Sequence, residues 1–199
     1  MTDETAQFLE RHFDTAFDAP DGIEKLRELI LTLAMQGKLV EQNPNDLPAC
    51  KLLQKISLEK QHLIQEGKIK KPKRFQKIKP EDLPYEVPEN WEWAQLHDVS
   101  LKIHYGYTAS ANYNLTNTRL LRISDIQDNK VDWQSVPGCE IKERDTEQYL
   151  LSDNDILIAR TGGTVGKSYL VKDIDVKSVF ASYLIRVVPS INIDVNYLK

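Results

Sequence analysis

The sequence predicts an α+β protein, with an N-terminal helical hairpin followed by a mixed, β-rich domain. Two apolar patterns with a period near 3.6 residues occupy the chain between residues 21 and 66. From residue 91 onward, apolar residues alternate or run over strand-like lengths, with turn residues between them. A segment rich in proline and lysine, residues 67–90, divides the two patterns. We therefore expect three parts, at 1–66, 67–90 and 91–199.

The helical part consists of two expected helices, while the first twenty residues fit either a helix or a frayed tail. The first helix is predicted over residues 21–40, where Asp21 and Glu24 have the spacing of a capping box and Gly37 is a natural stop. The second is predicted over 48–66, with a glycine directly after it. A short loop joins them, so we expect an antiparallel hairpin.

The dividing segment has the composition of an extended, irregular linker. It holds four prolines, and seven Lys/Arg lie between Lys68 and Lys79. Residues 49–80 carry ten basic and two acidic side chains, a local charge of +8 in a chain of net charge −4. Such a stretch either meets a polyanion or is a solvated linker, and charge alone leaves both open.

The β-rich part is expected to form strands at six places and to be truncated at its C-terminus. The expected strands are residues 91–96, 99–107, 119–126, 155–160, 168–172 and 178–188. The chain stops after "NIDVNYLK", which lacks the composition of a natural tail. The sequence thus predicts a fragment or a shortened form of something longer.

Bulk features point to a cytoplasmic protein without a membrane span. No run of eighteen apolar residues occurs, and the acidic N-terminus lacks the apolar core of a signal peptide. Cys50 and Cys139 have no metal-binding spacing, and we expect them to be free thiols in a reducing compartment.

The glycine-rich stretch "IARTGGTVGKSYL" (158–170) superficially resembles a phosphate-binding P-loop. That loop needs a glycine five residues before Gly166, where this chain has Thr161. It also leads from a strand into a helix, whereas the residues after Lys167 favour a second strand. We expect a hairpin here, and an ATP- or GTP-using enzyme remains only as an alternative.

Catalytic and metal-binding patterns are missing from the sequence. The four histidines form neither an i, i+4 pair nor an HExxH motif, and no GxSxG occurs. We therefore expect no catalytic residues, no metal site and no cofactor.

Five segments in a fixed order carry a family resemblance. They are "LRELILTLAMQGKLV", "LLQKISLEKQHLIQEGKIKKPK", "VPENWEWAQL", "LRISDIQDNKVD" and "DNDILIARTGGTVGKSYLV". Over residues 22–199 the chain resembles the N-terminal region of specificity subunits of type I restriction–modification systems, with one target recognition domain. The resemblance places the glycine-rich segment with Arg160, Gly162 or Gly163, Gly166 and Lys167 in that recognition domain.

The resemblance implies a DNA-reading protein without catalytic activity. Such subunits read a split target, one half per recognition domain, while long helices hold the methyltransferase subunits. The implied partners are double-stranded DNA, methyltransferase (modification) subunits, a restriction subunit and a second copy of the chain. Only one region of the chain resembles a recognition domain. We therefore expect the chain to recognise one half of such a split DNA target. A protein-interaction or assembly fragment that reads no DNA is the alternative.

Three loops supply the candidate DNA-binding residues, because glycines let backbone N–H groups approach phosphates and polar side chains reach base edges. The residues are Tyr105, Tyr107, Thr108, Ser110 and Asn112 in the first loop, Arg122, Ser124 and Gln127 in the second, and Arg160, Thr161, Gly162, Thr164 and Lys167 in the third. Structural roles stay open: Arg122 can pair with Asp125, and the tyrosines can pack in the core.

Overall fold

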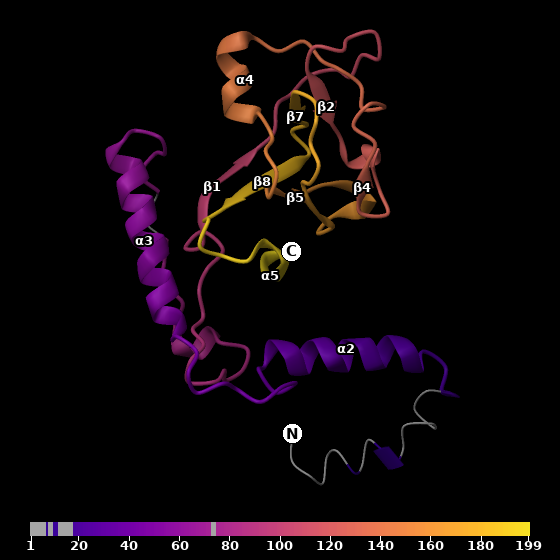
Figure 1. The fold of residues 1–199 in the computed structure, drawn as a ribbon. Helices are drawn as coiled ribbons and strands as arrows, with labels where there is room; N and C mark the ends of the chain where they lie inside the picture. The colour runs from indigo at the N-terminus through magenta and orange to yellow at the C-terminus, as the bar shows by residue number, and fades with distance from the viewer. Residues whose placement is uncertain (1–6, 8–9, 12–17, 73–74) are drawn as a thin grey trace. The chain divides into compact units, whose positions relative to one another are not determined.

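A computed structural model describes residues 7, 10–11, 18–72 and 75–199 (Figure 1). It confirms the α+β class, while the expectation for the first twenty residues falls largely outside the described residues. Contacts divide the chain into two compact units, one with residues up to Lys51 and Phe75–Trp93, the other with Leu52–Arg74 and Ala94–Lys199. The elements are α2 (Gly22–Met35), α3 (Ala49–Gln65), η1 (Pro80–Asp82), β1 (Ser100–Tyr105), β2 (Arg119–Leu121), η2 (Ile123–Asp125), β3 (Ile126–Gln127), β4 (Lys130–Val131), α4 (Glu143–Tyr149), β5 (Ile156–Ala159), η3 (Gly162–Thr164), β6 (Ser168–Leu170), β7 (Ser178–Phe180), β8 (Leu184–Pro189) and α5 (Val195–Leu198).

Helix α2 ends where the sequence placed a stop, but it begins without the expected cap. Gly37 adopts the left-handed conformation at φ 67°, and the N–H of Lys38 reaches back to the carbonyl of Leu33 at 2.8 Å. This is a Schellman ending, so residues 38–40 lie outside the helix. The capping-box prediction is wrong, because Asp21 itself has φ 64° and its side chain makes no cap hydrogen bond.

Helix α3 is confirmed, and from Leu52 onward it belongs to the same unit as the sheets. Ile56 is fully buried, and the ammonium of Lys60 donates to the carbonyl of His97 at 2.6 Å. The carboxylate of Glu59 accepts hydrogen bonds from the side chains of Ser190 and Asn192. These contacts fix α3 to the β-rich domain. Pairing of α2 with α3 stays a prediction, since α2 belongs to the other unit.

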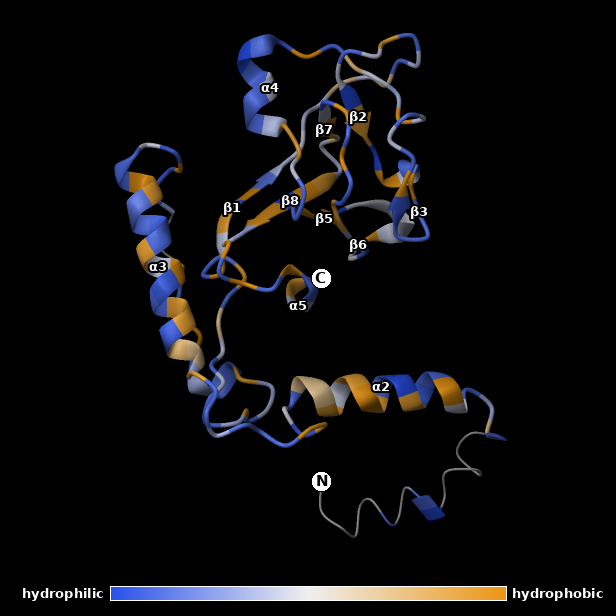
Figure 2. Ribbon diagram, in the orientation of Figure 1, coloured by the Kyte–Doolittle hydropathy of each residue, from blue (hydrophilic) through white to orange (hydrophobic). Residues whose placement is uncertain are grey.

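An antiparallel sheet in the order β1–β8–β5–β6 forms the centre of the β-rich domain. Its core lies on both faces, as the apolar run of β5 predicts. Leu157 and Ala159 join the main cluster around Phe180, while Ile156 packs in a second cluster with α5 residues. Figure 2 shows β5 and β8 as hydrophobic, whereas the exposed helix α4 is largely hydrophilic.

The segment 178–188 forms two strands, β7 and β8, instead of the single strand that the sequence predicted. Strand β7 pairs in parallel with β2, whereas β8 lies in the four-stranded sheet. The chain therefore leaves one sheet for the other at 181–183, where the N–H of Leu184 closes a turn on the carbonyl of Ala181 at 3.0 Å.

The strand expected at 91–96 is wrong. The N–H of Trp91 donates to the carbonyl of Pro88, and the N–H of Asp98 donates to the carbonyl of Gln95. These backbone groups form local turns at the two ends of the segment, so they are not available for pairing with another strand. The strand expected at 119–126 is shorter than predicted, because β2 ends at Leu121 and η2 follows it. The helices α4 and α5 and strand β4 were not predicted. They have two to seven residues each, which is too short for a periodic pattern to show.

Candidate nucleic-acid interface

The first candidate loop is held against the turn between β7 and β8. The N–H of Tyr107 donates to the carbonyl of Phe180 at 2.8 Å, and the N–H of Ser182 donates back to the carbonyl of Tyr107 at 3.0 Å. Gly106 makes this approach possible. A Cβ at this position would lie 2.3 Å from the carbonyl oxygens of both Phe180 and Ala181, so a larger residue does not fit.

The other two candidate loops reach the same turn. The N–H of Ala181 donates to the carbonyl of Leu121 at 2.9 Å, immediately before Arg122. The N–H of Arg160 donates to the carbonyl of Tyr183 at 3.0 Å. Residues 180–183 therefore gather three loops that are far apart in the sequence, and we call this place the convergence turn. The sequence predicted the three candidate loops, and the structure shows that they contact the same turn.

Arg160 and Tyr105 form an exposed pair at this surface. The guanidinium carbon of Arg160 lies 4.4 Å from the centroid of the Tyr105 ring, a cation–π distance. The tyrosine is 57% exposed, and Arg160 is exposed as well. Within the described part of the chain, no carboxylate forms an ion pair with Arg160. A guanidinium that stacks through its face keeps its in-plane N–H groups available for another partner.

The glycine-rich segment is a hairpin loop, as the sequence predicted. Strands β5 and β6 pair antiparallel, and the N–H groups of Ala159 and Gly166 close the hairpin on the carbonyls of Lys167 and Ala159, each at 2.9 Å. No helix follows, which removes the anion-binding geometry of a P-loop. A Cβ at Gly162 or Gly166 would meet nothing within 4 Å, so the backbone is open to a ligand. Thr161 and Lys167 are exposed, and Thr164 is half-buried.

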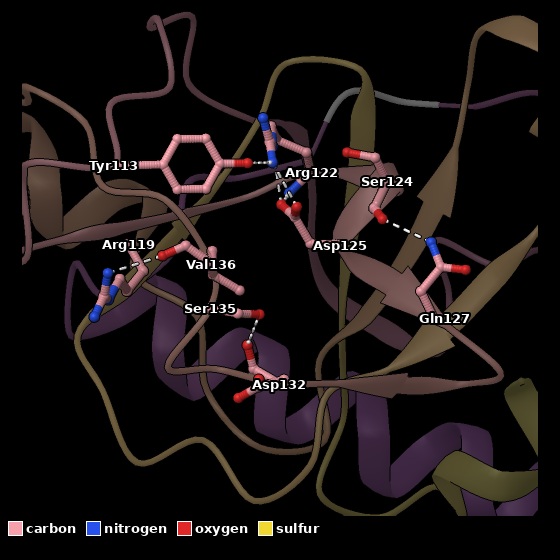
Figure 3. Close-up of polar contacts among 9 residues, drawn as sticks. All are labelled: Tyr113, Arg119, Arg122, Ser124, Asp125, Gln127, Asp132, Ser135 and Val136. Carbon is pink, nitrogen blue, oxygen red and sulfur yellow. Dashed lines mark hydrogen bonds and ion pairs between the residues drawn. The ribbon is translucent and has the colours of Figure 1, made fainter.

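Arg122 is held by its neighbours, as the structural reading of the sequence allowed (Figure 3). Its Nη2 lies 2.6 Å from Oδ1 of Asp125, its Nε donates to Oδ2 at 3.0 Å, and its Nη2 also donates to the Tyr113 hydroxyl at 3.1 Å. These hydrogen bonds to Asp125 and Tyr113 raise the pKa of Arg122 above its ordinary value. In the same view, Gln127 Nε2 donates to the Ser124 carbonyl at 2.8 Å.

The remaining residues of the first loop divide between surface and core. Thr108, Ser110 and Asn112 are exposed, and Oδ1 of Asn112 accepts from the backbone N–H of Asn114 at 2.9 Å. Tyr107 is half-buried, with its ring centroid 5.3 Å from that of Tyr149, so it is partly a packing residue.

Sequence reasoning missed two tyrosines at this surface. Tyr183 lies in the convergence turn and is 57% exposed, and Tyr113 faces Arg122 and is 69% exposed. Both stand in segments with turn or strand patterns. The sequence held no clear signal for either residue, because tyrosine is common in strands and its exposure depends on the fold.

His104 lies beneath the candidate surface, on β1. Burial is the largest cause that lowers the pKa of its imidazole, to about 4, and the nearby charge of Lys102 lowers it further. Its ring packs against those of Phe180 and Tyr149. The imidazole is therefore neutral near pH 7 and acts as a packing group. Over the residues with described positions, no group of three or more His, Cys, Asp or Glu side chains is arranged to hold a metal ion.

Comparisons with known proteins decide the family. No family model matches the chain. The specificity subunit of the type I restriction enzyme EcoAI of Escherichia coli is 41% identical over 155 residues, which is 76% of this chain and 26% of that protein. The EcoEI specificity subunit, also of Escherichia coli, is 31% identical over 187 residues, 89% of this chain and 31% of that protein.

The chain is homologous to the specificity subunits of type I restriction enzymes. This confirms the family that the sequence segments predicted. It spans about a quarter to a third of the length of these two relatives. A putative specificity subunit, MjaX of Methanocaldococcus jannaschii, is 36% identical over 75 residues, 37% of this chain and 18% of that protein. Among solved structures, the HsdS subunit from Thermoanaerobacter tengcongensis matches with a TM-score of 0.46 and 14% identity, over 88% of this chain and 38% of that one.

Within the described part of the chain, no helix has both the length and the apolar character needed to cross a membrane.

Proposed function

We propose that the chain recognises a short DNA sequence as a specificity subunit, or half of one, of a type I restriction–modification complex. The homology supports the family, and the convergence turn supports the site. The three loops that meet there carry the guanidinium of Arg160, which has no ion pair among the described residues, the exposed Lys167, exposed glycines and exposed tyrosines. Charge, backbone donors and hydrogen-bonding side chains are the elements with which proteins hold phosphates and read bases.

The observation that carries this proposal is the meeting of the three loops at residues 180–183. Closing the β5–β6 hairpin does not require Arg160 to lie beside the two other polar loops. Their meeting therefore favours a binding role for this surface. The chain has a net charge of −4, so binding to a polyanion depends on where its basic groups stand.

Selection from random duplex DNA tests the proposal. The full chain, alone and with its methyltransferase subunit, is incubated with a random-sequence duplex library, and the affinity for enriched sequences is measured at several salt concentrations. We expect one short motif to be enriched and the affinity to fall linearly with salt on logarithmic axes. Neither enrichment nor salt-dependent binding under either condition would refute the proposal.

The proposed partners follow from the helices. Leu31 and Met35 on α2 are 62% and 58% exposed, which extends the apolar stripe beyond what one helix partner needs. We assign this face to a methyltransferase subunit or to a second copy of the chain, with the restriction subunit joining the assembled complex and catalysis lying in those partners. A chain that stays monomeric at high concentration and does not bind the methyltransferase subunit would contradict this assignment.

The alternative, an assembly fragment that reads no DNA, predicts partner binding without any salt-dependent DNA binding. The comparisons do not favour it, because the relatives are named specificity subunits. A nucleotide-using enzyme is opposed by the β5–β6 hairpin, and calorimetry with ATP and GTP would test it directly.

A further inference from the structure

We infer that Tyr105 is a positioning residue that holds Arg160 for the recognition of a guanine in the major groove. The inference rests on the proposed function. It starts from the stacking of the two side chains, whose centre-to-centre distance is 4.4 Å. Tyr105 is the last residue of β1, and Arg160 directly follows β5. Strand β8 lies between β1 and β5 and pairs with both, so the side chains approach each other across the end of one sheet.

The backbone of Arg160 is fixed as firmly as its side chain. Its N–H is bonded to the carbonyl of Tyr183, and the preceding Ala159 pairs with both Leu184 and the hairpin loop. A side chain that leaves a hydrogen-bonded strand end and has its guanidinium over an aromatic ring samples fewer rotamers than one with neither contact. Little conformational freedom is then lost when its N–H groups meet a ligand.

Arg160 and Arg122 differ in what their guanidinium groups already bind. Arg122 donates through Nε and Nη2 to Asp125 and Tyr113. The guanidinium carbon of Arg160 lies 4.4 Å from the centroid of the Tyr105 ring, and within the described chain no acidic side chain pairs with this guanidinium. Of the two arginines at the convergence turn, Arg160 is the one that presents a free fork of donors.

Guanine is the ligand that fits a free, preoriented guanidinium fork. Its O6 and N7 acceptors lie side by side in the major groove and accept two parallel N–H bonds from arginine. A phosphate also accepts two such bonds, but it carries no sequence information. The two cases differ in measurement: loss of a base contact relaxes one position of the target, whereas loss of a phosphate contact weakens all sequences equally.

The experiment measures the affinity of the full chain for the selected duplex and for a set of duplexes with one base pair changed in each. The variants are Arg160→Ala, Tyr105→Leu and Tyr105→Phe, with Tyr197→Leu as a matched exposed tyrosine on α5, outside the three candidate loops. We expect Arg160→Ala to lose roughly 5- to 150-fold of discrimination at one G·C pair. Tyr105→Leu should lose discrimination at that same pair by roughly 2- to 30-fold, because the cation–π contact is gone. Tyr105→Phe keeps the ring and should behave as the parent, as should Tyr197→Leu.

Three results would overturn the inference. They are an unchanged base preference in Tyr105→Leu, an equal loss on all duplexes, and additive effects of Tyr105→Leu and Arg160→Ala in the double variant, since coupled residues are not additive. Should Tyr105→Leu fail to fold, Tyr105→Gln replaces it at this exposed position, with melting temperature measured on each variant. A parent chain that binds no DNA would refute the proposed function instead, which separates the two failures.

Discussion

Asp155 and Arg186 form a buried ion pair, with Oδ2 and Nη2 2.7 Å apart and side chains only 3% and 9% exposed. Asp155 directly precedes β5, and Arg186 lies on β8 opposite Leu157. The same carboxylate also accepts the N–H of Ser152 at 2.7 Å. Asp155 is the acidic residue closest in sequence to Arg160. Because it pairs with Arg186, it is not the partner of Arg160.

Breaking this pair should strongly destabilise the fold. Asp155→Asn leaves the guanidinium of Arg186 buried without a counter-charge, and we expect a loss of about 3–5 kcal/mol in the free energy of unfolding. Urea denaturation followed by circular dichroism measures it. Asp153→Asn is the matched control, because that side chain is exposed and an asparagine oxygen can still accept the hydrogen bond from the N–H of Ile174, so the change should cost less than about 1 kcal/mol. Equal effects of the two variants would show that the pair is not important for stability.

Gly106 should be irreplaceable, although it is not in a left-handed conformation. In Gly106→Ala the new methyl group would collide with the carbonyls of Phe180 and Ala181, so the first loop must move away from the convergence turn. We expect a loss of roughly 1–3 kcal/mol in stability and weaker DNA binding. Gly163→Ala serves as the control for stability alone, since its Cβ would meet nothing within 4 Å. Thermal melting of both variants and DNA titration of Gly106→Ala decide the point. A Gly106→Ala protein with the stability and DNA affinity of the parent would contradict the described packing.

Lys167 should contribute to DNA binding by charge alone. Its side chain is exposed at the end of the hairpin, and Lys167→Ala should fold normally, bind all duplexes more weakly and lower the salt slope by roughly one. Lys172→Ala removes the same charge beyond the other end of β6 and should leave both quantities unchanged. Fluorescence titrations over a range of salt concentrations compare the two. Identical salt slopes in Lys167→Ala and the parent would exclude the phosphate contact.

Arg122 and Asp125 should act as one structural group. In a double-mutant cycle with Arg122→Ala and Asp125→Ala, we expect a coupling of about 1–2 kcal/mol in unfolding free energy, because each residue is the other's main partner. Chemical denaturation of the four proteins measures it. Additive losses would mean that the pair seen in Figure 3 does not stabilise the second loop.

Acid should weaken the fold through His104. Its folded-state pKa of about 4 lies below the ordinary 6.5, so its contribution is complete above pH 6.5 and is lost as the pH falls through about 4. Lys102 and Arg186 face the ring with positive charge, and Tyr149 and Phe180 pack on it. We expect the stability difference between the parent and His104→Gln to shrink between pH 6.5 and pH 4. Unfolding at pH 7, 5.5 and 4.5 tests this, and a constant difference would contradict it.

Local patterns in the sequence were sufficient for the main elements of the fold. The 3.6-residue period and the two glycines at 37 and 67 located α2 and α3, because helix faces and left-handed endings depend on neighbouring residues only. The apolar run 155–160 and the glycine spacing after it predicted the β5–β6 hairpin and excluded a P-loop for the same reason. Family-specific segments predicted the homology that the comparisons confirmed.

Only the tertiary structure decided which residues meet. The partner of Arg186 on β8 is Asp155, more than thirty residues earlier, and the partner of Arg160 is Tyr105, at the end of another strand. The break of segment 178–188 at Ala181 also has a long-range cause, since β7 pairs with β2 and β8 with β1 and β5. A single sequence carries no record of such pairings, because strand register and side-chain partners depend on contacts between distant segments. The sequence by itself therefore determined the elements and the candidate loops, and folding determined that these loops converge on residues 180–183.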